Sequence, residues 1–434
     1  MKPIAGLIRD WQLRSVVRNA GRVYSDFAPE KIPSYQLEKF NQLWVGIRRQ
    51  VPFYRKLVAE GFAPSEGLTW EDFVRLPKLS RIEIQRDVSP YLDDTKPIAN
   101  WSVTGGSTGM PIRIPRWANE NDFTLPAIWL GRASYGIQVS DRMFHLWGHS
   151  HLFGRGWQRY QAQLKRAVKN FFLGYRTFSA YNLNPKRLDE AGRALLQMKP
   201  EYIVGYSRSL FLLAKANFDQ REKLRGLRIK AVIATTEAFS SAEDSALIAD
   251  VFGCPVVMEY GAAETGVIAY THPNDGCYRV FWDLFLLEAI PLDEQRSKLL
   301  VTTLYPRAMP LIRYDIGDIA IDATRQADSV IGFSGISGRD NDLIEFEPGS
   351  FVHPVALIHC IQSVIGVLGV QVVQEVDSSI RIRIMGKPTI SAGERQIRDN
   401  LKTLHTRLGN CAIEYVPALE QTIAGKTRWV IRRS

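Results

Sequence analysis

A glycine-rich stretch in the first third of the chain has the composition of an anion-binding loop. The sequence SVTGGSTGMPIRIPR (Ser102–Arg116) places three glycines and four hydroxyl side chains within its first eight residues. Glycine permits backbone conformations in which successive N–H groups converge on an anion, and hydroxyls add further donors. The composition predicts a phosphate-binding loop, but it is equally typical of an ordinary hairpin or linker. The loop residues would be Thr104, Gly105, Gly106, Ser107, Thr108 and Gly109.

Histidine and cysteine form a second group of residues with possible chemistry. His272 and Cys277 lie close together in THPNDGCY, whereas the four cysteines of the chain are far apart and form no CxxC pair. This spacing predicts neither a disulfide framework nor a zinc ribbon, and it favours a reducing compartment. Two ligands are too few for a closed zinc site, so the sequence leaves open whether His272 and Cys277 bind a metal.

The segments around these residues alternate between helical and strand patterns. Apolar residues at helical spacing predict a helix from Tyr35 to about Val51-Pro52, a second helix through FYRKLVAEGF, and a mainly helical first ninety residues. After the glycine-rich stretch, the strand-like runs YIVG, KAVIAT and CPVVMEYG alternate with helical stretches, which predicts βαβ units and a parallel sheet. Beyond Pro273, the runs RVFWDLFLLEAI, KLLVTTLY and LIRYDIGDIAI predict successive strands of an added β subdomain.

A compositional break at GISGRDNDLIEFEPGS separates a smaller unit that runs from Asp342 to the last residue. Its patterns predict a helical start at HPVALIHCIQSV, a strand at SIRIRIMG, a helix at AGERQIRDNLKTLHTRLG and a strand pair around IAGKTRWVI. The fold class expected is therefore α/β, with a large N-terminal domain over residues 1–340 and a small mobile α+β domain over residues 341–434.

Composition limits the class of protein and its partners. The chain has 434 residues, of which 45% are hydrophobic and 23% charged, as in a soluble globular protein. A net charge of +10 favours anionic partners, but the basic residues are scattered and no nucleic-acid-binding signature is present. Charges interrupt the apolar residues of MKPIAGLIRDWQLRSVVRNAG, which predicts neither a signal peptide nor a spanning helix and favours a cytoplasmic location. An amphipathic start that touches a membrane surface stays compatible with this pattern.

Five short motifs occur in an order that resembles a known superfamily. They are TGGSTGMP (Thr104–Pro111), EYGAAETG (Glu259–Gly266), RAMPLIRYDIGD (Arg307–Asp318), SGRDND (Ser337–Asp342) and AGKTRW (Ala424–Trp429). Together they resemble the adenylate-forming enzymes, in the branch of phenylacetate-CoA ligase, coenzyme F390 synthetase and the capsule-biosynthesis protein CapK. The segments VPFYRKL, KPEYIVGYSRSL and TTEAF resemble the same branch.

The resemblance implies ATP-dependent activation of a carboxylic acid. In such enzymes a carboxylate attacks the α-phosphorus of ATP, and a nucleophile then captures the acyl-adenylate. The loop at Thr104–Gly109 would hold the β- and γ-phosphates, although Ile112 and Arg113 stand where the superfamily often has a lysine. Glu264 would hold Mg²⁺, which prefers oxygen ligands, but a capping or surface glutamate is the alternative.

The resemblance also assigns the residues around the nucleotide. Tyr260 would lie against the adenine, or else be a core tyrosine. Asp318 would accept hydrogen bonds from both ribose hydroxyls, with Asp315 as a rival of more structural character. The remaining residues on the nucleotide side would be Gly261, Ala262, Glu237 and Arg339, the last at the domain junction.

Two C-terminal residues would serve domain rotation and catalysis. Asn341 falls at the hinge position, where the superfamily usually has Asp or Lys. Rotation there would bring Lys426 to the α-phosphate in one pose and admit the second substrate in the other. A solvated surface lysine is the alternative for Lys426.

The region FHLWGHSHLFGRGWQRY (Phe144–Tyr160) corresponds to the carboxylic-acid site of the superfamily. Its histidines could orient a substrate or simply make hydrogen bonds within the core. The predicted pocket residues are Trp147, His149, His151 and Tyr206.

The function expected is therefore adenylation of a small carboxylic acid with ATP and Mg²⁺, followed by transfer to CoA as the probable co-substrate. A rival is transfer to an amine acceptor, such as a surface sugar in polysaccharide biosynthesis. A remote alternative is a non-catalytic nucleotide- or acyl-binding protein. A homodimer is one oligomeric state that the sequence leaves open.

Overall fold

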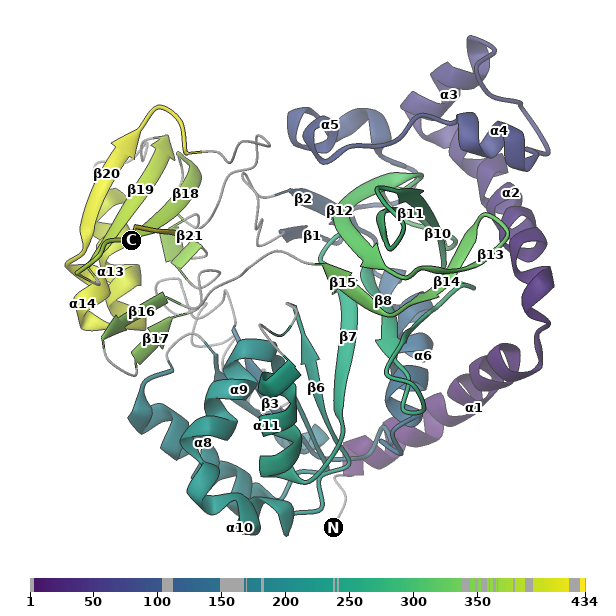
Figure 1. Cartoon of the computed structure of the whole chain (residues 1–434). Helices are drawn as coiled ribbons and strands as arrows, with labels where there is room; N and C mark the ends of the chain where they lie inside the picture. Colours follow the sequence, from purple (N-terminus) through teal and green to yellow (C-terminus); the bar gives the residue numbers. More distant parts are fainter. Residues whose placement is uncertain are drawn as a thin grey trace.

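The protein is described here by a computed structural model. It describes residues 4–103, 112–148, 168, 170–180, 183–236, 239, 242–337, 344–347, 350–352, 357–358, 360–361, 364, 366–377, 379–386, 393–420 and 430–433. Figure 1 shows a large main body and a smaller unit, formed by the C-terminal part of the chain, at its side. Within the described ranges, no helix combines the length and the apolar character that a bilayer crossing requires.

The N-terminal region is helical, as the apolar spacing predicted. The second helix, α2, buries Phe40, Trp44 and Ile47, and it ends at Gln50, with Val51 as the extended cap before Pro52 opens the next helix. Proline is favoured in the first helical turn because its missing N–H has no partner there in any helix. The helices of this region are α1 (Ile4–Asp26), α2 (Ile32–Gln50), α3 (Pro52–Ala59), α4 (Trp70–Arg75) and α5 (Arg81–Arg86), with the 3-10 turns η1 (Pro29–Lys31) and η2 (Ser89–Tyr91).

A nine-stranded sheet forms the centre of the main body, in the order β13-β14-β9-β8-β7-β6-β5-β3-β4. The strands from β7 to β4 pair in parallel, which confirms the βαβ prediction, and the others pair antiparallel. Every residue of β5 and β6 is buried, as expected for parallel strands covered on both faces. The strands are β3 (Met143–Trp147), β4 (Tyr175–Ser179), β5 (Tyr202–Tyr206), β6 (Ala231–Thr235), β7 (Val256–Ala262), β8 (Gly266–Thr271), β9 (Tyr278–Val280), β13 (Thr324–Gln326) and β14 (Ser329–Phe333).

Helices gather on both sides of this sheet. Figure 1 shows α8, α9, α10 and α11 together in front of the parallel strands, whereas α6 lies near α1 on the other side of β7. Asn184 caps α8 by accepting a hydrogen bond from the backbone N–H of Arg187. The bounds are α6 (Glu120–Ala133), α8 (Pro185–Met198), α9 (Ser207–Ala216), η4 (Phe218–Gln220), α10 (Arg221–Arg225) and α11 (Ala242–Phe252).

A second, antiparallel sheet has the order β10-β11-β12-β15 and confirms the added β subdomain. The predicted single strand RVFWDLFLLEAI is wrong, because the chain turns between Val280 and Phe285 and passes from the first sheet to the second. The predicted strand at LIRYDIGDIAI begins only at Tyr314, since Arg313 has a positive φ of 49°. The bounds are β10 (Phe285–Pro291), β11 (Arg296–Thr303), β12 (Tyr314–Ile321) and β15 (Gly335–Ser337), and a separate hairpin pairs β1 (Asn100–Val103) with β2 (Arg113–Arg116).

The C-terminal unit contains a four-stranded sheet of order β20-β19-β18-β21 and a separate hairpin of β16 and β17. Its described residues include the helices α13 and α14, and residues 357–358 and 360–361 are also helical, as predicted for HPVALIHCIQSV. Its strand at SIRIRIMG is confirmed, but the single helix predicted through AGERQIRDNLKTLHTRLG is wrong, because His405 is extended and caps a second helix. The bounds are β16 (Ile344–Glu347), β17 (Ser350–Val352), β18 (Val367–Gln374), β19 (Ile380–Gly386), α13 (Gly393–Leu404), α14 (Thr406–Gly409), β20 (Ala412–Val416) and β21 (Val430–Arg432). The domain boundary at residues 340–341 lies outside the described residues and stays a prediction.

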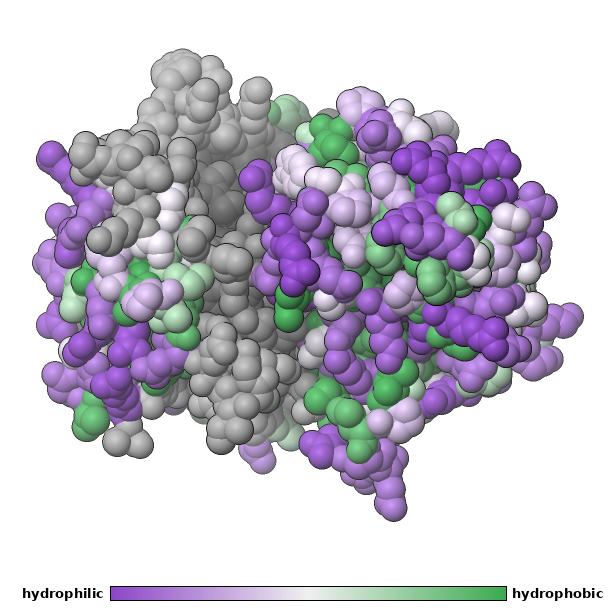
Figure 2. Space-filling model, turned by 90° about the horizontal axis from the view of Figure 1, so that it is seen from above, coloured by the Kyte–Doolittle hydropathy of each residue, from purple (hydrophilic) through white to green (hydrophobic). Residues whose placement is uncertain are grey.

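Hydrophilic residues dominate the outer margins of the upper face of the molecule, with apolar residues scattered among them (Figure 2). This pattern agrees with the ordinary balance of charged and apolar residues in the sequence.

Candidate active site

The predicted nucleotide residues lie at the turn between β7 and β8. A Cβ atom on Gly261 would stand 2.2 Å from the carbonyl oxygen of Gly266, so only glycine allows the two strands to approach this closely. Gly266 itself has a φ of +78°, in the region that favours glycine. Thr265 closes the turn, because its Oγ1 accepts from Ala262 N–H at 3.2 Å and donates to the Gly266 carbonyl at 2.9 Å. The turn between the strands is thus tightly defined.

Glu264 stands in this turn and is almost completely buried, with 5% of its surface exposed. Its Oε1 accepts from Nη1 of Arg81 at 2.9 Å and from the hydroxyl of Tyr314 at 3.2 Å. Both bonds are made to Oε1, which leaves Oε2 for a further ligand. Glu264 is therefore neither a surface glutamate nor a helix cap.

Backbone pairing explains why Arg81 and Tyr314 reach Glu264 together. Leu79 forms a parallel bridge with Tyr314, in which Leu79 N–H donates to Arg313 and Asp315 N–H donates to Leu79. Ser80 then starts α5 with a capping box completed by Glu83, which places Arg81 at the first position of the helix. Arg81 and Tyr314 thus arrive from two neighbouring backbones.

Tyr260 and Asp318 meet beside this turn. The Tyr260 hydroxyl donates to Oδ2 of Asp318 at 3.0 Å, between β7 and β12. The Tyr260 ring packs edge-on against Phe333, with ring centroids 5.6 Å apart, and is 9% exposed. Asp315, the rival carboxylate, instead forms an ion pair with Lys298 at 2.5 Å and accepts from Gly317 N–H. The structure thus brings Asp318, and not Asp315, to Tyr260.

The predicted pocket residues Trp147 and Tyr206 lie together at the carboxyl ends of β3 and β5. Their ring centroids are 4.7 Å apart, and His145 stacks on Trp147 at 4.9 Å. Ligands of open α/β sheets bind at this edge of parallel strands. Thr236, which follows β6 at the same edge, has a φ of +82°, an uncommon conformation for a β-branched residue.

Several predicted site residues lie outside the described residues. They are the glycine-rich loop Thr104–Gly109, His149, His151, Glu237, Arg339, Asn341 and Lys426. Their assignments stay predictions from the sequence.

The sequence left open whether His272 and Cys277 bind a metal. Within the described ranges, no three His, Cys, Asp or Glu side chains are grouped as a metal site would require. The two residues belong to a turn in which His272 N–H donates to the Cys277 carbonyl at 2.8 Å.

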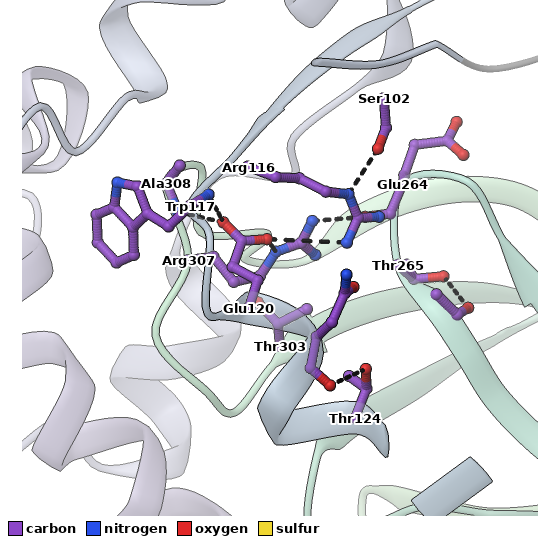
Figure 3. Close-up of polar contacts among 12 residues, drawn as sticks. Ser102, Arg116, Trp117, Glu120, Thr124, Glu264, Thr265, Thr303, Arg307 and Ala308 are labelled. Carbon is purple, nitrogen blue, oxygen red and sulfur yellow. Dashed lines mark hydrogen bonds and ion pairs between the residues drawn. The ribbon is translucent and has the colours of Figure 1, made fainter. Parts of the chain in front are cut away.

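A set of charged residues beneath the turn was not identified from the sequence. Figure 3 shows Arg116, Glu120 and Arg307 converging beside Glu264. Arg116 ends the stretch SVTGGSTGMPIRIPR and Arg307 opens RAMPLIRYDIGD, but nothing in either motif indicates that the two side chains meet. Arg81 and Tyr314 were missed for the same reason, because each contacts Glu264 only through the fold.

Comparison with known proteins identifies the type of domain and fold. Residues 344–433 match the family model of the CapK C-terminal domain. Protein CapK of Staphylococcus aureus is 23% identical over 91% of this chain and 88% of its own length. Residues 344–433 thus resemble a CapK C-terminal domain, and the chain has the fold of the adenylate-forming ligases. That fold is shown by 2-hydroxyisobutyryl-CoA ligase in complex with 2-HIB-AMP and CoA, which aligns with a TM-score of 0.57 at 20% identity over 94% of this chain and 90% of its own.

A second curated relative is the phenylacetate-coenzyme A ligase of Aromatoleum evansii, which is 22% identical over 73% of this chain and 72% of its own length. The predicted resemblance to the phenylacetate-CoA ligase and CapK branch of the adenylate-forming superfamily is therefore confirmed.

Proposed function

We propose that this protein activates a small carboxylic acid with ATP to an acyl-adenylate and transfers the acyl group to the thiol of CoA. The observation that carries the proposal is the hydrogen bond of 3.0 Å between Tyr260 and Asp318, beside a buried Glu264. This pair places a carboxylate and an aromatic ring at one end of the central sheet, next to a second carboxylate. Asp318 suits the ribose, the Tyr260 ring suits the base, and Glu264 suits a metal-bound phosphate.

The reaction has two steps. An oxygen of the substrate carboxylate attacks the α-phosphorus of ATP, a new O–P bond forms, and pyrophosphate leaves. The sulfur of CoA then attacks the acyl carbon, AMP leaves, and the thiol proton passes to solvent. Asp318 would accept hydrogen bonds from the ribose hydroxyls, which its two oxygens can do simultaneously. Tyr260 would orient Asp318 and present its ring to the adenine.

The donor set at Glu264 fits a magnesium ion. A carboxylate oxygen is the ligand that Mg²⁺ prefers, and Oε2 of Glu264 is not engaged by Arg81 or Tyr314. When bound there, the ion would neutralise charge on the phosphates during the first step. Arg81 and Tyr314 would hold the Glu264 carboxylate in place while the ion is bound.

The residues outside the described ranges complete the proposal by resemblance. The loop Thr104–Gly109 would bind the β- and γ-phosphates, and Arg339 would meet the nucleotide at the domain junction. Lys426 would approach the α-phosphate in the first step, with Asn341 as the hinge. Glu237, His149 and His151 would complete the nucleotide and acid sites beside Trp147 and Tyr206.

Transfer to an amine is the second candidate. The match to CapK extends over 91% of the chain and includes the C-terminal domain. CapK is a capsule-biosynthesis protein by the resemblance described above, so an amino sugar of a surface polysaccharide is the amine to test first. We also propose a cytoplasmic location, which the four free cysteines favour. A homodimer stays a prediction.

The test is acid-dependent exchange of pyrophosphate into ATP across aryl, short-chain, fatty and amino acids, followed by addition of CoA or amines. The proposal predicts exchange with at least one acid, a requirement for Mg²⁺, and a thioester detected by mass spectrometry. Adenylation that discharges only to an amine would favour the second candidate. Absence of exchange with every acid, while ATP still binds, would favour the non-catalytic alternative.

A further inference from the structure

A buried cluster of three charged side chains lies beneath the turn that carries Glu264. We define the arginine clamp as Arg116, Glu120 and Arg307 (Figure 3). The side chains of Arg307 and Glu120 are 0% and 1% exposed, and Nε of Arg307 lies 3.6 Å from Oε2 of Glu120. Nη1 of Arg116 lies 3.8 Å from the same oxygen. One carboxylate therefore faces two guanidinium groups in the protein interior.

Glu120 joins two segments through its other oxygen. Oε1 accepts from the backbone N–H of Trp117 at 3.0 Å and from that of Ala308 at 2.8 Å. Trp117 directly follows β2. The strands β1 and β2 stand before and after residues 104–111, and we call this pair of strands the glycine-loop hairpin. Ala308 belongs to the segment between β11 and β12. Glu120 thus fixes the base of the glycine-loop hairpin against the segment that contains Arg307.

The two arginines hold consecutive carbonyl groups of the Glu264 turn. Nη2 of Arg116 donates to the Ala263 carbonyl at 2.7 Å, and Nη2 of Arg307 donates to the Glu264 carbonyl at 2.6 Å. Arg116 also donates from Nε to Ser102 of β1 at 2.7 Å. Figure 3 shows the backbone of Glu264 facing the arginines and its carboxylate pointing away from them. With its carbonyl held on one side, Glu264 directs its carboxylate to the other side, towards Arg81.

A neighbouring contact holds the same turn from the same segment. The hydroxyl of Tyr305 donates to the Thr265 carbonyl at 3.2 Å, and its ring stacks on Phe123 of α6 with centroids 5.8 Å apart. Glu120 and Phe123 stand three positions apart on α6 and therefore share a face of the helix. The first helical turn of α6 thus contacts both Tyr305 and Arg307, which bond to the carbonyl groups of Thr265 and Glu264.

Stability does not explain the arginine clamp. Burial lowers the pKa of Arg116, and the adjacent Arg307 lowers it further, which reflects the cost of placing a cation in the interior beside a second one. Nε and Nη1 of Arg307 and Oε2 of Glu120 make no hydrogen bond with the described residues. Apolar side chains of similar volume would stabilise such a buried position equally well or better. A role in geometry accounts for charges that stability does not require.

We propose that Arg307 and Glu120 are positioning residues that set the direction of the Glu264 carboxylate relative to the glycine-loop hairpin. This inference rests on the proposed function, because the direction matters when Glu264 and the loop act on one metal-bound nucleotide. Neither residue needs to touch the nucleotide. The fork of an arginine is required, since lysine presents a single point charge and cannot hold the same directions.

The test compares Arg307→Met and Arg307→Lys with Arg132→Met as a matched control. Arg132 is also a mostly buried arginine with a long ion pair, at 3.8 Å from Glu259, and it lies near the other end of α6, about 18 Å along the helix from Glu120. Affinity for Mn²⁺ in the presence of ATP is measured by electron paramagnetic resonance. Affinity for ATP alone is measured by calorimetry in EDTA.

We expect Arg307→Met to weaken Mn²⁺ binding about tenfold or more while affinity for metal-free ATP stays unchanged. Arg307→Lys should recover only part of the loss, and Arg132→Met should lower the melting temperature without changing Mn²⁺ affinity. Equal losses in both affinities for Arg307→Met, or an unchanged Mn²⁺ affinity, would overturn the proposal.

Hydrogen exchange of the nucleotide-free protein tests the same inference without any activity. Peptides covering residues 259–270 should exchange faster in Arg307→Met and in Glu120→Gln than in the wild type, and Arg132→Met should not reproduce a change centred on Ala263–Gly266. Unchanged exchange in that turn would contradict the positioning role of Arg307 and Glu120, even if the protein adenylates an acid. If the wild-type protein adenylates no acid, the proposed function is contradicted instead. The hydrogen-exchange result would then still test the positioning role of Arg307 and Glu120.

Discussion

Arg81 and Glu264, 183 positions apart in the chain, form a hydrogen-bonded ion pair of 2.9 Å in a mostly buried site. Their side chains are 17% and 6% exposed. The carboxylate proposed to bind magnesium is therefore already paired with a protein cation. Metal binding at Oε2 would place a second cation beside Arg81.

Replacing Arg81 by Gln should make folding stability depend on the metal. Removal of one partner leaves Glu264 buried without a cation, which we expect to cost on the order of 3 kcal/mol of unfolding free energy. Mg²⁺ should restore part of this loss, whereas the wild type should respond little to Mg²⁺. The measurement is urea unfolding of both proteins with and without Mg²⁺ in the absence of nucleotide. An equal response of the two proteins to the metal would show that Glu264 does not bind it.

Replacing Asp318 by Ala should weaken ATP binding. The change removes a charge-assisted contact to the ribose worth on the order of 1.5–3 kcal/mol, which is about tenfold or more in affinity. Asp315→Ala is the control, because Asp315 is paired with Lys298 near the surface. Calorimetry with ATP should separate the two variants. If Asp315→Ala weakens binding and Asp318→Ala does not, the two assignments must be exchanged.

Replacing Gly261 by Ala should destabilise the β7–β8 turn. The new Cβ would lie 2.2 Å from the Gly266 carbonyl and 2.8 Å from Cα of Val267, so the backbones must separate. We expect a loss of about 1–3 kcal/mol in unfolding free energy, together with reduced nucleotide affinity. Gly335→Ala is the control, since its Cβ would meet only the side chain of Ile321, at 3.5 Å. Similar urea midpoints for both variants would argue against a close approach at Gly261.

Replacing Lys426 by Ala should separate the two half-reactions. The lysine is expected to serve only adenylation, so the variant should lose acyl-adenylate formation yet still convert a synthetic acyl-adenylate to product. Asn341→Pro should show the opposite bias, because proline fixes φ near −65° and would hold the hinge in one pose. Mass spectrometry of the acyl-adenylate measures the first step, and mass spectrometry of the thioester measures the second step. Equal losses in both steps for Lys426→Ala would contradict a two-pose mechanism.

One error in the predicted secondary structure occurred where distant residues fix a turn. RVFWDLFLLEAI is mostly apolar and was predicted as one strand, yet the chain turns at Trp282 and Asp283. The carbonyls of these two residues accept hydrogen bonds from Gln36 at 2.7 Å and Lys39 at 2.6 Å, both on α2. No glycine or proline marks this turn, so a local pattern could not reveal it.

The sequence by itself determined the helical N-terminal region, the parallel strands and the motifs around Glu264 and Asp318. These features depend on apolar periodicity and on side-chain chemistry within a few residues, and both are local properties of the chain. Only the tertiary structure decided that Tyr260 bonds Asp318, that Arg81 pairs with Glu264, and that Arg116, Glu120 and Arg307 meet beneath one turn. Tyr260 and Asp318 are 58 positions apart, Arg81 and Glu264 are 183 positions apart, and Glu120 reaches Ala308 across 188 positions. Many pairings of charged residues are compatible with the composition, and the packing of the sheets and α6 selects among them.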